Sequence, residues 1–89
     1  LPQDHQEDLA MTHNQQRFAD LYRFNLRRAV VERPDDYRFI ADKVDEVADK
    51  MIAAIARGSA NKDGYAFKET CKALGIPHTY KAISAYWNS

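Results

Sequence analysis

The sequence has few of the residues that mark disulfide-rich or membrane-spanning chains. It holds one cysteine, three glycines and three prolines among 89 residues. A single cysteine excludes an internal disulfide and is typical of a reducing compartment, so we expect a cytoplasmic protein. No apolar run reaches the roughly 18 residues of a membrane helix, so we expect no membrane partner. No basic start precedes an apolar stretch, which argues against a signal peptide.

The formal net charge is zero, but the charges are not evenly spread along the chain. Residues 1–11 and 34–56 each carry a net charge of −3, whereas residues 12–33 and 57–89 each carry +3. Strong nonspecific binding to nucleic acid needs a large net positive field, which this composition does not supply. A local basic face on one of the two basic segments is still compatible with the sequence.

Patterns typical of metal binding and catalysis are missing. The three histidines are scattered and Cys71 has no CxxC partner, so the sequence predicts no zinc site. Residues 61–64 resemble part of a calcium loop, but the preceding aspartates and the closing glutamate are not there. No nucleophile elbow and no glycine-rich phosphate loop occurs. We therefore expect a protein that is not an enzyme and has no metal and no cofactor.

Apolar residues make up 45% of the chain and recur at helical spacing, with no run of strand-like alternation. The predicted fold class is all-α, a small helical bundle of two long antiparallel helices plus a C-terminal helical hairpin. Residues 1–11 are polar and acidic, and we expect a flexible N-terminal arm there. Residues 12–89 are expected to form a single helical domain.

The first predicted helix begins after Thr12 and runs to about Glu32. Thr12 and Gln15 have the spacing of a capping box, in which the hydroxyl and the amide each bind a backbone N–H at the helix start. Phe24 lies off the apolar stripe, so we expect it to contact a partner or the arm. The stripe itself consists of Phe18, Leu21, Tyr22, Leu26, Ala29 and Val30.

The second predicted helix spans residues 36–57, after a break at Arg33 and Pro34. Its acidic residues crowd the expected outer face, where such runs usually form a solvated surface. They are Asp42, Asp45, Glu46 and Asp49. Its apolar residues keep helical spacing for about 20 residues, and five of them are expected to be buried: Ile40, Val44, Val47, Met51 and Ile55.

The last third of the chain predicts two short helices around a tight turn. Phe67, Cys71 and Leu74 lie on one helix face, and Cys71 is expected to be a buried packing residue. Gly75 occupies the position of a left-handed C-cap, and Pro77 suits the start of another helix. The apolar stripe of that second helix is Ile76, Tyr80, Ile83 and Trp87.

Over residues 66–87 this hairpin resembles the helix-turn-helix superfamily. Those modules commonly show a small residue, three further residues and a glycine, and Cys71 and Gly75 match that pattern. Leu74 and Ile76 match the apolar positions that flank the glycine. The family's next apolar position corresponds to Lys81, and apolar residues arrive one place earlier, so the turn is expected to be one residue shorter than usual. The resemblance implies that the second helix enters a DNA major groove.

The resemblance also implies a set of DNA-contacting residues. The outward face of the second hairpin helix presents small and hydrogen-bonding groups suited to base edges, which are His78, Thr79, Lys81 and Ser84. Lys68 and Lys72 on the first hairpin helix are expected to contact phosphates, as are the arginines of the first long helix. Our first interpretation is a small DNA-associated regulatory or accessory protein, of a build common among phage, plasmid and other mobile-element proteins.

The alternative interpretation is a helical protein–protein interaction module that does not bind DNA and can form a homodimer. Segregated acidic and basic segments suit pairing between copies or with another protein. Tyr86, Trp87 and Phe24 are the candidate interface residues under this interpretation. For Tyr86 and Trp87 we favour a role in closing the core over a role in an interface, because large aromatics dominate small cores.

Overall fold

The computed structural model describes residues 11–58 and 64–89, and the predicted arm over residues 1–11 lies outside this range apart from Met11. Helix α2 (His13–Glu32) begins at the predicted capping box. The Thr12 hydroxyl accepts the Gln15 backbone N–H at 3.1 Å, and the Gln15 side chain accepts the Thr12 N–H at 3.2 Å. Both bonds satisfy donors that a helix start leaves without partners. The other helices are α3 (Pro34–Tyr37), α4 (Val44–Ala56), α5 (Tyr65–Leu74) and α6 (Tyr80–Trp87).

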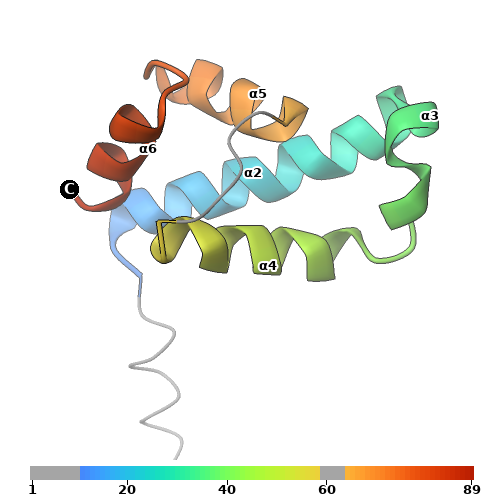
Figure 1. Ribbon diagram of the computed structural model, residues 1–89, viewed down its shortest axis with the longest axis horizontal. Coiled ribbons are helices and arrows are strands. Elements are labelled where there is room, and N and C mark those ends of the chain that lie inside the picture. Colours follow the sequence, from blue (N-terminus) through green and yellow to red (C-terminus); the bar gives the residue numbers. More distant parts are fainter. Residues whose placement is uncertain (1–10, 59–63) are drawn as a thin grey trace, which may run out of the picture.

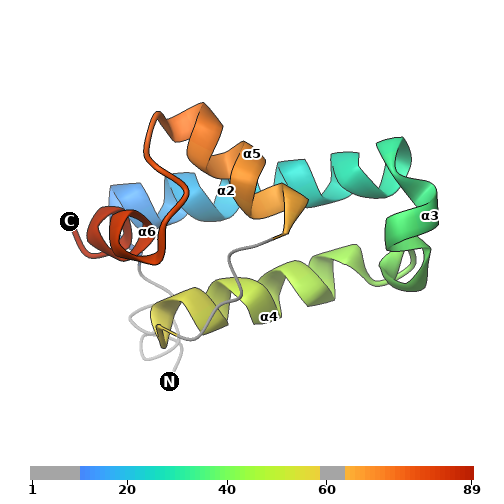
Figure 2. The same ribbon diagram turned by 45° about the horizontal axis from the view of Figure 1, so that its top comes forward.

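Helix α2 is the central element of the bundle (Figures 1 and 2). Helices α4 and α5 pack along it on different sides, and α6 packs at the end where α2 begins and α4 ends. No strand occurs in the described ranges, so the all-α class is as expected. The core forms where these helices meet, from Phe18, Tyr22, Leu26, Ile40, Ile52, Ile55, Phe67, Cys71, Ile83 and Trp87.

Aromatic side chains dominate the centre of that core. Phe18 and Phe67 are almost completely buried, and their ring centroids lie 6.3 Å apart. Trp87 meets Phe18 edge-on at 6.0 Å, which attaches α6 to the first turns of α2. Truncating a buried phenylalanine to alanine typically costs about 3–5 kcal/mol, so these rings supply much of the bundle's stability.

The prediction of one continuous helix over residues 36–57 is wrong in its extent. One turn of α3 is followed by a 3₁₀ turn, η1 (Arg38–Ile40), and α4 begins only at Val44. The chain bends at residues 41–43, and Ile40, just before the bend, is buried in the core. Burial of an apolar side chain outweighs the hydrogen bonds that a continuous helix would add, because tertiary packing supplies most helix stability.

Two of the five side chains predicted to be buried in this region are buried. Ile40 and Ile55 are buried, whereas Val44, Val47 and Met51 are half-buried and pack against the core. Helix α4 runs antiparallel to α2 (Figure 1).

Helix α5 ends at the predicted glycine cap, and α5 and α6 each pack mainly on α2 rather than on each other. Gly75 has a φ of 72°, and the Ile76 N–H donates to the Cys71 carbonyl at 3.0 Å, as in a Schellman motif. The connection to α6 spans residues 75–79, which is longer than the usual three or four residues of a helix-turn-helix and corrects the expected shorter turn. Ile83 and Trp87 are buried as predicted, but Tyr80 is 46% exposed.

Candidate nucleic-acid interface

Helix α6 begins at an N-cap residue, Thr79. The Thr79 hydroxyl accepts the Ala82 N–H at 3.1 Å, so it fixes the first turn of a helix that is only eight residues long. A helix of that length spans about 12 Å, enough for its first two turns to meet one groove. Lys81 lies on the exposed side of this helix, and Ser84 is half-buried beside it.

Three of the predicted DNA-contacting residues share one electrostatic property. Lys68, Lys72 and Lys81 are exposed, and none of them forms an ion pair within residues 11–58 and 64–89. Lys68 and Lys72 are one helical turn apart, so their Cβ atoms lie about 6 Å from each other. These ammonium groups are held by long flexible stems in water, which leaves them available to an anionic ligand.

The only carboxylate on α5 or α6 is already engaged. Glu69 accepts a hydrogen bond from the Arg28 guanidinium at 3.2 Å, which ties α5 to α2. Helices α5 and α6 therefore each expose lysine side chains, three in all, and the one carboxylate on these helices is compensated by an arginine of α2.

The predicted polar groups at the hairpin are partly used in local hydrogen bonds. The Thr79 hydroxyl accepts a hydrogen bond from the Ala82 backbone N–H, and the Ser84 hydroxyl accepts one from the Asn88 side-chain amide. Each hydroxyl still has its own proton to donate. His78 is half-buried in the connection before α6. These three residues sit close in sequence to Lys81, whereas Lys68 and Lys72 belong to the other helix.

Most arginines of α2 form ion pairs, unlike the lysines of α5 and α6. Arg23 and Arg27 bind Asp49 and Asp45 of α4, with shortest distances of 3.0 Å and 2.7 Å. These two pairs keep one antiparallel register between α2 and α4. Three of the four arginines of α2 thus form ion pairs with carboxylates of other helices, and within the described residues Arg17 does not.

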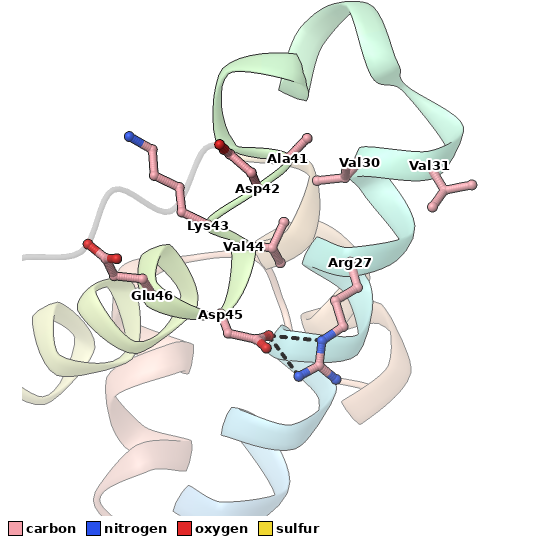
Figure 3. A pocket seen from close by; sticks show the side chains of 9 residues that line it. All are labelled: Arg27, Val30, Val31, Ala41, Asp42, Lys43, Val44, Asp45 and Glu46. Carbon is pink, nitrogen blue, oxygen red and sulfur yellow. Dashed lines mark hydrogen bonds and ion pairs between the residues drawn. The ribbon is translucent and has the colours of Figure 1, made fainter.

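The pair of Arg27 and Asp45 borders a groove on the described surface (Figure 3). The groove has a volume of about 560 Å³ and lies between the C-terminal half of α2 and the bend that precedes α4. Val30 points toward Ala41 and Val44 across it, whereas Val31 points away (Figure 3). A smaller apolar cleft of about 300 Å³ lies between α4 and α5, with Tyr22 and Leu26 among its lining residues.

The predicted interface residues do not come together. Trp87 is 6% exposed, and Tyr86 is half-buried with its ring 6.4 Å from that of Phe18, so both close the core. Phe24 alone is well exposed, at 57%. Val31 is 78% exposed and was not singled out from the sequence, although its position seven residues after Phe24 places both on one side of a helix.

Two buried titratable groups have raised pKa values. Burial raises the pKa of Tyr22 to about 12, with a smaller contribution from Tyr37. Burial also raises the pKa of the Cys71 thiol, which is 1% exposed, as expected for a packing residue. A buried thiol of raised pKa is a poor nucleophile. No group of three or more metal-binding side chains occurs in the described ranges.

Within the described residues, 11–58 and 64–89, no helix is both long enough and apolar enough to cross a bilayer. Comparison with protein-family models, with curated proteins and with solved structures gives no match. We therefore infer function from the chain's own residues.

Proposed function

We propose that this chain is a small DNA-associated accessory or regulatory protein that contacts DNA through α5 and α6. The observation that carries the proposal is that every lysine of α5 and α6 is exposed and has no ion pair within the described residues. Lys68, Lys72 and Lys81 have no carboxylate partner within the described part of the chain, whereas the α2 arginines mostly do. Phosphate binding by such lysines releases counterions from DNA, which is the main source of affinity in nonspecific complexes.

The acidic side chains of α4 are the main argument against DNA binding, and their contacts weaken it. Asp45 and Asp49 each bind an arginine of α2, so their charges are compensated within the protein. Glu46 is 3.5 Å from Lys50 on the same helix. The repulsion between α4 and a phosphate backbone is therefore smaller than the sequence charges suggest.

In this proposal the two helices have different roles. Lys68 and Lys72 on α5 supply phosphate contacts, which set orientation without reading sequence. Lys81 and Ser84 on the first turns of α6 meet base edges. Because α6 is short and the net charge is zero, we expect weak, salt-sensitive affinity, with a Kd of about 1–100 µM.

A pair of charge-reversal variants tests this proposal. Fluorescence anisotropy of a labelled random-sequence duplex would be measured at low salt with the wild type, with Lys72→Glu/Lys81→Glu and with Lys43→Glu/Lys50→Glu. Both variants change the net charge equally and alter only exposed lysines. The hairpin variant is expected to lose affinity by about tenfold or more, and the control much less. Equal losses would mean that only overall charge matters, and the proposed interface would be rejected.

A second candidate function rests on a separate observation. Phe24 and Val31 expose large apolar side chains on α2, and Phe39 of η1 is 73% exposed. Neighbouring exposed apolar residues on one helix face are typical of protein–protein contact sites. An interaction module, the alternative that the sequence also suggested, would use this face of α2 and leave the lysines of α5 and α6 in water.

A further inference from the structure

The outward face of α2 exposes two large apolar side chains, more than any other helix face in the described ranges. Phe24 is 57% exposed and Val31 is 78% exposed, and they lie two turns apart on the same side. The opposite side of α2 holds Phe18 and Tyr22, which are buried in the core. Exposing a phenyl ring and a branched aliphatic group on one stripe costs hydration free energy that a docked surface recovers.

On this face, residues of unlike character lie at equal spacing before and after Phe24. Asp20 and Arg28 lie four residues before and after it, and Arg17 and Val31 lie seven residues before and after it. A two-fold axis through Phe24 that relates two antiparallel α2 helices therefore brings unlike groups together. Asp20 meets Arg28 of the second copy, and Arg17 meets Val31 of the second copy. Each contact occurs twice, as in any isologous interface.

We propose that a second copy of this chain docks on this face, with the two α2 helices antiparallel and centred on Phe24. The two phenyl rings stack at the axis. The aliphatic stem of each Arg17, which has no ion pair within the described residues, covers Val31 of the second copy. The Arg28 guanidinium, whose carbon is 5.8 Å from the Phe24 ring centroid, binds Glu69 of its own chain at 3.2 Å and adds a second carboxylate contact, with Asp20 of the second copy.

This inference rests on the interaction role assigned to α2 and is independent of DNA binding by α5 and α6. One helix face per copy makes a small interface, and small interfaces are usually weak. We therefore expect reversible dimerisation at protein concentrations between about 1 µM and 1 mM.

Sedimentation equilibrium of the full chain over that range tests the proposal with four variants. Phe24→Ala is expected to abolish the dimer, whereas Phe39→Ala removes a still more exposed ring from η1 and is expected to leave the dimer intact. Val31→Lys and Val31→Glu both remove the apolar group but differ in sign. Because Arg17 of the second copy faces this position, Val31→Lys is expected to weaken dimerisation at least several-fold more than Val31→Glu.

The outcomes separate this inference from the two functional roles. A wild type that stays monomeric up to about 1 mM overturns the self-association, and DNA binding would still be measured separately. A dimer that Phe24→Ala leaves intact, or that Phe39→Ala dissociates, places the contact elsewhere and also overturns it. Equal effects of the two Val31 variants contradict the antiparallel register. Circular dichroism of each variant confirms that the helices are retained, since all altered side chains are exposed.

Discussion

The hydroxyl of Tyr80 donates a hydrogen bond of 2.6 Å to the backbone carbonyl of Gly58, which joins the first residue of α6 to the chain just after α4. Gly58 has a φ of 74°, in the left-handed region that favours glycine. A Cβ added at Gly58 would collide with the Tyr80 hydroxyl, so this glycine serves both the backbone turn and the close approach of the tyrosine. The bond positions the start of the helix that carries Lys81.

This relationship predicts non-additive substitutions. Gly58→Ala is expected to cost about 2 kcal/mol or more, because the left-handed backbone alone costs roughly 1–2 kcal/mol and the hydrogen bond to Tyr80 is also lost. In a Tyr80→Phe background the same substitution should cost only the backbone part, since the hydroxyl is gone. Thermal unfolding of the two single variants and the double variant measures the coupling. Additive costs would show that Gly58 and Tyr80 do not interact.

A buried polar pair between α2 and α5 gives a second prediction. The Asn25 amide donates to the Thr70 hydroxyl at 3.1 Å, and that hydroxyl donates to the Ala66 carbonyl at 2.7 Å. Thr70→Val leaves the buried amide without its acceptor and is expected to cost about 1–3 kcal/mol. Thr70→Ser keeps the hydroxyl and should cost less, and adding Asn25→Leu to Thr70→Val should recover part of the loss. Urea unfolding of these variants provides the comparison.

The raised pKa of Tyr22 predicts how stability changes at alkaline pH. An unfolded tyrosine ionises near pH 10, whereas Tyr22 in the folded chain has a pKa of about 12. Below pH 10 the group is neutral in both states, so stability is retained there. Between about pH 10 and 12 the unfolded state loses its proton first, and stability should fall by about 2–3 kcal/mol. Tyr22→Phe should reduce this alkaline loss, and an unchanged pH profile in that variant would contradict the assignment.

The helix α2 and the cap at Gly75 were predictable because local signals determine them. A capping box and a glycine in the left-handed region act within a few residues, so the chain carries the information directly. The bend before α4 was not predictable in this way. Helical spacing continues through residues 41–43, and the break depends on burial of Ile40 against elements distant in sequence.

The candidate site was predictable only in part. The sequence identified Lys68, Lys72 and Lys81 as exposed cations, but it could not reveal that Asp45 and Asp49 bind the arginines of α2. Those pairs depend on the register between two helices, which no local pattern specifies. Val31 was not identified because it lies outside the apolar stripe of its helix. Its spacing from Phe24 was the signal that could have identified it.

The central claim is that the lysines of α5 and α6 bind DNA phosphates, and the salt dependence of affinity tests it most directly. A plot of log Kd against log salt concentration would be measured by anisotropy for the wild type and for Lys68→Gln/Lys72→Gln/Lys81→Gln. Each phosphate contact contributes about 0.9 to the slope, so the wild type should exceed the variant by about 2.7. Equal slopes for the two proteins, or no binding by the wild type at low salt, would contradict the account.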